Sequence, residues 1–312
     1  MTERWNARQF HNQPEESHQH QFLVGLWTSV RDETGGRFDC GVHAQNGSIP
    51  GSDPQALPML ISGTLEFYTL MGGALGDIAP AMLVQGLPFA FSKSEQIHRA
   101  MDGELGGYLR AEMTAKGLHC FPHGLMENGF RQISSIDRPI RSADDLAGFK
   151  IRVPPARFFT DVFTSLGADP KPVNIRELYH ALEHRLVDGQ ENPLVITEVN
   201  RLYEVTRHVS ITNHMWSGFN MLANLEFWTS LPSDVQETIQ RNVTKYVAQQ
   251  RAYTMKLNHE LEVRLAQRGL VFTTADAASF RRKLGSDFYR RWKTEIGARA
   301  WNLLEAGVGR LG

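Results

Sequence analysis

The longest part of the chain without a helix-breaking residue runs from Ser233 to Arg268, a stretch that contains neither glycine nor proline. Pro232 stands just before it, Asp234 suits a first helical turn, and Gly269 follows the last turn. The pattern predicts one helix roughly 50 Å long, at about 1.5 Å per residue. Because that length exceeds one small lobe, we expect the helix to lie across two lobes as a spine.

The rest of the chain alternates between strand and helix patterns, which predicts an α/β fold. Apolar residues recur at helical spacing over 18–32, and Gly35 and Gly36 end that pattern. Further predicted elements are strands over 38–42, 62–70 and 149–153, an apolar helix or turn over 80–87, and a helix over 158–166. At 312 residues the chain is about twice the size of a usual domain, which favours two lobes or one large α/β domain.

The charge balance argues against nucleic acid and membrane partners. Lys and Arg number 33 against 34 Asp and Glu, so the chain has no basic field to attract nucleic acid or an anionic membrane. No apolar run approaches the roughly 18 residues that span a bilayer, and the first residues do not look like a signal peptide. The chain is therefore either cytoplasmic, or exported with its signal peptide already removed.

The sequence contains two cysteines, Cys40 and Cys120. They are too few for a disulfide framework, and their spacing is not that of a metal knuckle. We interpret them as buried thiols, and one bridge between them stays open as the alternative.

A possible anion site lies where a strand meets a helix. Over 149–153 apolar residues alternate with Lys150 and Arg152, and Pro154 and Pro155 separate this strand from the next helix. A guanidinium beside the unpaired N–H groups of a first helical turn suits a carboxylate or a phosphate. On the pattern alone, a surface arginine at a strand end is the favoured interpretation.

The sequence His180-Ala-Leu-Glu183-His184 matches the HxxEH pattern of inverted zinc peptidases, in which two histidines bind zinc and the glutamate activates water. The apolar stripe of the same helix consists of Leu178, Ala181, Leu182 and Leu186. The two histidines and Glu183 lie on the opposite arc, so a solvated helix face is the favoured alternative. No third zinc ligand is identifiable, and nothing in the sequence demands catalysis.

A second group of histidines, His11, His18 and His20, stands near the start of the chain. It is a candidate metal cluster, but residues two apart on a helix point in different directions. We therefore expect no metal there, and we expect no cofactor elsewhere in the chain.

Ten motifs follow one another along most of the chain. The central ones are Asp145-Leu-Ala-Gly-Phe-Lys-Ile-Arg152-Val-Pro, Leu166-Gly-Ala-Asp-Pro-Lys-Pro, Glu177-Leu-Tyr-His-Ala-Leu and Val187-Asp-Gly-Gln-Glu-Asn192-Pro. The outer ones are Glu16-Ser-His18, Thr34-Gly-Gly-Arg37, Gly86-Leu-Pro-Phe89, Asn128-Gly-Phe-Arg131, Thr212-Asn-His214 and Phe227-Trp-Thr-Ser-Leu-Pro232. Taken in their order along the chain, these ten motifs resemble the DctP family, the substrate-binding proteins of TRAP transporters.

The resemblance implies a two-lobed periplasmic binding protein fold, with mixed sheets flanked by helices and the long spine helix bridging the lobes. Lobe I would comprise 1–128 with 213–252, and lobe II 129–212 with 253–312. Such a receptor closes around an organic acid and delivers it to the TRAP membrane permease; it is not an enzyme, and we expect a monomer. A sensor protein in place of the permease, or a zinc-dependent hydrolase built on His180, Glu183 and His184, are the alternatives.

The resemblance also assigns a carboxylate site. The family's signature arginine corresponds to Arg152, its second arginine to Arg131 and its pocket asparagine to Asn192. Two guanidiniums and an amide would bind a carboxylate strongly, because charge-assisted hydrogen bonds are about twice as strong as neutral ones. Arg185 stands where the family often has a glycine, which puts the expected glycine end of the preceding helix in doubt.

The sequence favours an apolar surrounding for the far end of the ligand. Residues 69–72 offer no charge, and Trp216 and Phe219 add aromatic side chains, although Trp216 has an equal claim to a core position. We therefore favour a monocarboxylate with a modest hydroxyl, keto or apolar tail over sialic acid. Three further candidates for ligand contact, for which a scaffold or surface role is the favoured alternative, are Tyr68, His11 and Glu127.

Overall fold

The computed structural model describes residues 4–45, 49 and 53–311, which fall into two compact units of three segments each. Unit 1 comprises Met1–Met71, Met101–Glu127 and Gly218–Tyr253, and unit 2 comprises Gly72–Ala100, Asn128–Ser217 and Thr254–Gly312. Strands and helices alternate in both units, so the predicted α/β class is confirmed.

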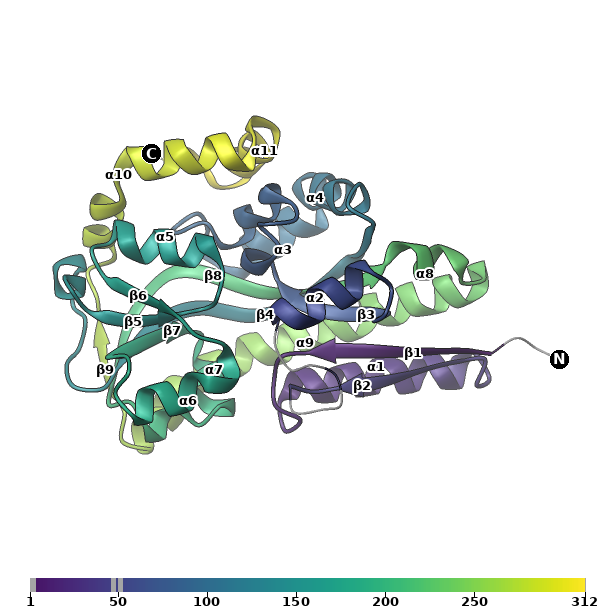
Figure 1. The fold of residues 1–312 in the computed structure, drawn as a ribbon, viewed down its shortest axis with the longest axis horizontal. Helices are drawn as coiled ribbons and strands as arrows, with labels where there is room; N and C mark the ends of the chain where they lie inside the picture. The colour runs from purple at the N-terminus through teal and green to yellow at the C-terminus, as the bar shows by residue number, and fades with distance from the viewer. Residues whose placement is uncertain (1–3, 46–48, 50–52, 312) are drawn as a thin grey trace. The chain divides into compact units, whose positions relative to one another are not determined.

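Unit 1 is built on a mixed set of strands with helices packed on them (Figure 1). Its strands run in the order β2 (Phe38–His43), β1 (Trp5–His11), β3 (Phe67–Met71) and the end of β8 (His208–Asn224). β1 is parallel to both β2 and β3, whereas β3 is antiparallel to β8. The helices of this unit include α1 (His18–Glu33), α2 (Asp53–Ile61), α4 (Glu104–Thr114) and α8 (Leu225–Ser230).

Aromatic packing holds α1 on the strands of unit 1. The ring of Trp27 lies 5.7 Å from that of Phe38 on β2 and 4.6 Å from that of Phe67 on β3, measured between centroids. Leu26 and Val30 are buried on the same side of the helix, as the helical spacing of apolar residues requires. The helix predicted over 18–32 is therefore confirmed.

Unit 2 contains a second set of strands, in the order β4 (Leu118–Ser135), β7 (Gly189–Asn192), β5 (Lys150–Val153) and β6 (Asp169–Pro172). β7 is antiparallel to β4 and parallel to β5, which is parallel to β6. The first part of β8 pairs in parallel with β9 (Val271–Thr274). β4 begins in unit 1 and continues into unit 2, and β8 runs from unit 2 into unit 1.

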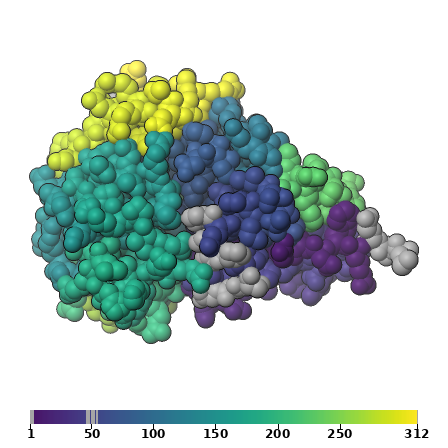
Figure 2. Space-filling view, viewed as in Figure 1, coloured from purple at the N-terminus to yellow at the C-terminus, as the bar shows by residue number. Residues whose placement is uncertain are grey.

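Helices cover the strands of unit 2 on both sides. Figure 1 shows α5 (Arg157–Ser165) on one side of β5 to β7, and α6 (Ile175–Glu183) with α7 (Leu194–Val199) on the other. The C-terminal helices α10 (Ala277–Ile296) and α11 (Ala298–Val308) form the yellow surface layer beside the teal part of this unit in Figure 2. α10 contacts α5 and the short helix η2 (Pro80–Gly86). The remaining short helices are η1 (Gly72–Ala74), α3 (Ser94–Asp102), η3 (Ala143–Leu146) and η4 (Leu202–Glu204).

The long helix predicted from the stretch without glycine or proline is confirmed as α9 (Ser233–Gln267). Its residues as far as Tyr253 belong to unit 1, and those from Thr254 belong to unit 2. Among the described residues, no helix combines the length and the hydrophobicity that a membrane crossing requires.

One shorter prediction needs correction. Over 62–70 the strand begins only at Phe67, because Ser62 and Gly63 form a turn that closes α2, with φ of 76° at Gly63. The apolar helix or turn predicted over 80–87 is confirmed as the 3-10 helix η2. The strand predicted over 149–153 and the helix over 158–166 are confirmed as β5 and α5, each shifted by one residue at one or both ends.

The unit boundaries and the predicted lobes divide the chain differently at Gly72–Ala100. The prediction assigns this segment to lobe I, whereas it belongs to unit 2, where η2 contacts α10 and α11. The extent of the lobes that move in the working protein stays a prediction.

Arg185 ends α6 without the glycine that is usual at such a position. It follows His184, the C-cap residue of the helix, and has φ of 54°, in the left-handed region. The N–H of Leu186 bonds to the carbonyl of Ala181 at 2.9 Å, which closes the helix end. The predicted apolar stripe is wrong at Leu186, which is 61 % exposed because the helix has ended before it.

Replacing Arg185 by glycine should stabilise the protein. The left-handed conformation costs a residue with a side chain about 1–2 kcal/mol, and the greater freedom of unfolded glycine offsets roughly half of that gain. We expect Arg185→Gly to raise the midpoint of thermal unfolding in calorimetry. Arg185→Ala is the control, since it removes the exposed ion pair with Asp137 and keeps the backbone cost. A glycine variant that unfolds below the alanine variant would show that the left-handed conformation carries no such cost.

Unit 1 contains three histidines that burial keeps neutral. Desolvation lowers the pKa of His11 to about 3, and the pKa values of His18 and His119 to about 4. The ring of His119 stacks on Trp228 with 4.4 Å between centroids. An unfolded histidine titrates near pH 6.5, so the unfolded state takes up protons before the folded state does.

The stability of the protein should therefore fall as the pH drops below about 6.5. At pH 5 each of the three histidines can cost up to about 2 kcal/mol of unfolding free energy, because only the unfolded state binds the proton. Calorimetric scans at pH 7.5 and pH 5.0 should show a lower unfolding midpoint at pH 5.0. A His119→Phe variant should lose part of that difference, and equal midpoints at both pH values would contradict the prediction.

Candidate functional site

A buried ion pair joins β4 to β7 in unit 2. Arg131 donates from Nε and Nη2 to the two carboxylate oxygens of Glu191, with 2.6 Å between Nη2 and Oε1. Both side chains are shielded from solvent almost completely. A guanidinium that meets both oxygens of one carboxylate forms the strongest kind of ion pair in proteins. The positive charge of Arg131 is therefore balanced inside unit 2.

His214 on β8 joins this ion pair. Its Nε2 donates to Glu191 Oε2 at 3.2 Å, and its Nδ1 lies 2.7 Å from Thr212 Oγ1. Burial favours a raised pKa for Glu191, but Arg131 and His214 outweigh it and hold that pKa below its ordinary value. Burial lowers the pKa of His214 more than Glu191 raises it. The cluster thus holds one cation, one anion and a neutral imidazole, and carries no net charge.

Arg131 also fixes the orientation of Asn192, the last residue of β7. Nη2 of Arg131 donates to Asn192 Oδ1 at 3.1 Å, and Asn192 Nδ2 donates to Gln190 Oε1 at 2.6 Å. Nη1 of Arg131 donates to Ser217 Oγ at 3.4 Å. Two of the residues predicted for the carboxylate site, Arg131 and Asn192, are thus brought into direct contact.

Arg152 is 2 % exposed, so its interpretation as a surface arginine is wrong. It is buried because β5 has a strand on each side, β6 and β7. Its Nε donates to the carbonyl of Val173 at 2.8 Å. Arg152 lies opposite Gln190 in the register of β5 with β7, and alternation along the strand puts Gln190 and Asn192 on the same face. The third predicted residue therefore stands one strand from Asn192 and two strands from Arg131.

Trp216 is also buried in unit 2. Its ring meets that of His98 edge to face, with 6.1 Å between centroids. The guanidinium of Arg131 lies over the ring of Phe159 at 5.3 Å, so an aromatic face covers one side of the ion pair. Apolar cover of this kind removes water and strengthens the electrostatic interactions beneath it.

The other predicted contact residues belong to unit 1. Phe219 lies opposite Met71 in the register of β8 with β3, and is buried. Glu127 is buried too, and its backbone exchanges two hydrogen bonds with the side chain of Gln250. Tyr68 donates its hydroxyl proton to Asp53. Phe219, Glu127 and Tyr68 all lie in unit 1.

Both ring nitrogens of His11 are engaged inside unit 1. The N–H of Gln13 donates to Nδ1 of His11 at 3.3 Å, so Nδ1 is the acceptor nitrogen of a neutral ring. The proton on Nε2 then points to Nδ1 of His20, 2.9 Å away. This bond ties the end of β1 to the first turn of α1, which is a scaffold role.

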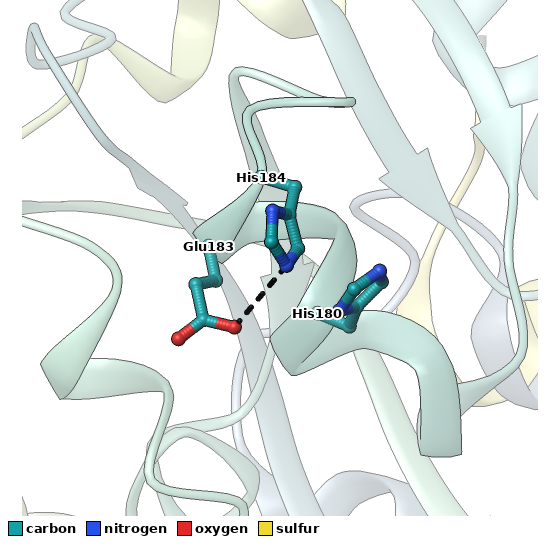
Figure 3. Close-up of side chains that lie close together, drawn as sticks. All are labelled: His180, Glu183 and His184. Atoms are coloured by element: carbon teal, nitrogen blue, oxygen red, sulfur yellow. Dashed lines mark ion pairs between the residues drawn. The ribbon is translucent and has the colours of Figure 1, made fainter.

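The HxxEH histidines do lie close together, on one turn of α6 (Figure 3). The ligand atoms of His180, Glu183 and His184 are within 4.8 Å of one another, and Glu183 Oε2 lies 3.6 Å from His184 Nε2. All three side chains are exposed to solvent. A catalytic zinc needs a third firm ligand and a shielded cavity, so this geometry favours the solvated helix face.

Sequence reasoning missed two members of the buried cluster, Glu191 and His214. Both stand inside motifs that carried the family resemblance, next to Asn192 and Asn213 respectively. The signal for Glu191 is an acidic residue in a four-residue strand that is buried throughout. A buried acid requires a cation, and Arg131 is the one that β4 supplies.

Comparison with protein families gives a match over most of the chain. The model of the DctP family, described as bacterial extracellular solute-binding protein, family 7, matches residues 10–294. This family is one of solute-binding proteins, and the comparisons give no support to a zinc hydrolase.

Curated relatives are similar at 25–30 % identity. The C4-dicarboxylate-binding periplasmic protein DctP of Rhodobacter capsulatus is 30 % identical over 187 residues, 56 % of this chain and 55 % of that protein. The 2,3-diketo-L-gulonate-binding periplasmic protein YiaO of Escherichia coli K12 is 26 % identical over 225 residues, 72 % of this chain and 68 % of that protein. The match to protein y4mM of Sinorhizobium fredii, 30 % identical over 207 residues, spans only 38 % of that protein's length.

Solved structures share the fold over nearly the whole chain. The sugar acid binding protein DctPAm of Advenella mimigardefordensis, in complex with galactonate, has a TM-score of 0.91 and 27 % identity, covering 98 % of this chain and 99 % of that one. A TRAP periplasmic solute-binding protein of Polaromonas sp. JS666, bound to D-erythronate, has a TM-score of 0.90 and 26 % identity, covering 96 % and 98 %. With the family model matched over most of its length, the chain belongs to the DctP family of bacterial extracellular solute-binding proteins.

Proposed function

We propose that the chain is an extracytoplasmic receptor that binds an organic acid through its carboxylate and delivers it to a TRAP permease. Membership of a family of extracellular solute-binding proteins supports this function and its location outside the cytoplasmic membrane. The similar structures bound to galactonate and D-erythronate support an acid as the solute. The observation that carries the proposal is the buried guanidinium of Arg152 on β5, opposite Gln190 of β7.

The two arginines have different roles in this proposal. Arg131 is balanced by Glu191 and donates to Asn192, so it holds the amide in place. Arg152 is buried, and its Nε donates to the carbonyl of Val173. The planar fork of a guanidinium matches the two oxygens of a carboxylate. We therefore assign the main charge contact of the ligand to Arg152, and a supporting contact to Asn192 and Arg131. One such arginine suits one carboxylate, which supports a monocarboxylate.

The remaining candidate residues for ligand contact have a smaller part in this proposal. Trp216 and Phe219 are buried aromatic side chains that suit the apolar parts of a solute. Tyr68, His11 and Glu127 are hydrogen-bonded within unit 1, so each acts mainly by fixing its neighbours.

Lysine at position 152 should weaken acid binding at least about tenfold, or 1.4 kcal/mol. Lysine keeps the charge but lacks the planar fork that meets two oxygens. A panel of organic acids, sugar acids and amino acids first identifies the acid that raises the melting temperature most, and calorimetry then measures its affinity. Arg176→Lys, at an exposed position of α6, is the matched control and should bind as the unchanged protein does. Equal affinity for Arg152→Lys and the control would remove Arg152 from the site.

Glu191→Gln should destabilise the protein by about 3–5 kcal/mol, because it leaves Arg131 buried without its counter-charge. The double variant Arg131→Met with Glu191→Gln should recover part of this loss, since no unpaired charge remains. Calorimetric unfolding of the two variants measures the difference. A double variant that unfolds below Glu191→Gln alone would show that the cost does not come from the uncompensated guanidinium.

A further inference from the structure

Three exposed side chains at the end of α6 each offer an atom that can ligate a metal ion. His180, Glu183 and His184 come from the last turn of the helix and its C-cap, and the atoms that they offer lie within 4.8 Å of one another. The two imidazole rings are 4.0 Å apart between centroids. Within the described ranges 4–45, 49 and 53–311, no second group of three such residues lies as close together.

The spacing of the two histidines suits a shared ion. Residues four apart on a helix lie on one face, one turn above the other. The same spacing brings two histidines to one zinc ion in the helical motif of metalloproteases. With ligands at about 2.0–2.2 Å in a tetrahedral arrangement, the ligand atoms stand roughly 3.4 Å apart. His180 and His184 can reach that separation by side-chain rotation, because both are exposed to solvent.

Glu183 adds a charged ligand beside the two imidazoles. Its Oε2 lies 3.6 Å from Nε2 of His184, and Figure 3 shows its carboxylate turned toward that ring. Two neutral imidazoles leave the double positive charge of the ion unbalanced, and a carboxylate in the same shell offsets half of it. Glu183 therefore fits the place of a third ligand, whereas in a hydrolase the same glutamate would activate water.

The end of the helix also favours a cation. The last carbonyl groups of a helix carry a partial negative charge, and His184 is the C-cap of α6. The neighbouring cation, Arg185, is paired with Asp137 at 2.8 Å, which weakens its repulsion of an ion at this place. Since the helix already orders the backbone of all three ligands, binding needs to fix only their side chains.

We propose that the end of α6 is a surface site for a divalent transition-metal ion such as Zn²⁺, bound by His180, Glu183 and His184 and by water. Imidazole ligands suit Zn²⁺, Cu²⁺ and Ni²⁺, whereas Mg²⁺ and Ca²⁺ prefer carboxylates, carbonyls and water. The three residues belong to unit 2 alone, and the inference is independent of the proposed carboxylate site. Because the side chains are open to solvent, the ion exchanges with solution and is neither catalytic nor a resident cofactor.

Calorimetric titration of Zn²⁺ into the full chain without an affinity tag tests the site. We expect one ion per chain, and His180→Ala and His184→Ala should each weaken binding at least about tenfold. His259→Ala is the matched control, since His259 is an exposed histidine of α9 in the same unit, and it should bind as the unchanged protein does. The inference is overturned if the unchanged protein binds no zinc, if His180→Ala binds it as the control does, or if Mg²⁺ binds as tightly.

Thermal unfolding shows whether the folded helix end assembles the site. An unfolded chain does not hold His180 and His184 on one face, so an ion that needs both binds the folded state preferentially. Saturating Zn²⁺ should raise the unfolding midpoint of the unchanged protein and of His259→Ala, and should leave that of the double variant His180→Ala with His184→Ala in place. An equal rise in the double variant would assign the effect to other residues and overturn the inference.

Discussion

The pairing of Arg131 with Glu191 is the interaction on which the chemistry of unit 2 depends. It places two charges in a buried position, and such a pair is tolerated only when both ions are matched and hydrogen-bonded. The match is complete here because β4 and β7 are neighbours and His214 supplies a further donor. The same guanidinium then holds Asn192. An ion pair that contributes little net stability can in this way fix the geometry of the Asn192 amide.

The two arginines of the proposed carboxylate site are held by different partners. Arg131 pairs with Glu191 on the adjacent strand, whereas the Nε of Arg152 donates to the backbone carbonyl of Val173. Both guanidiniums are buried, so the geometry of each is set by the groups that surround it.

Periodicity and breakers predicted the long helix α9, the helix α1 and the strand β5 with its arginine, because these depend on local patterns. The contacts of Glu191 and His214 were out of reach, since Glu191 and Arg131 are 60 residues apart and meet only through strand register. Leu186 was misjudged because Arg185 takes a backbone conformation that glycine usually takes. The family resemblance supplied the residues of the proposed carboxylate site, but not Glu191, the acid that balances Arg131.

The discontinuous make-up of the two units has a consequence for how the chain folds. β3 pairs with β8 through residues such as Leu70 and Asn220, which are 150 positions apart in the chain. During synthesis, one edge of β3 therefore has no partner strand until β8 has been made. Pairings this distant slow folding, and an open strand edge is prone to wrong association. Neither unit is a contiguous stretch of chain, so no single cut releases one of them whole. The pairing of β1 with β2 and β3 can form early, whereas the other edge of β3 stays unpaired until β8 has been made.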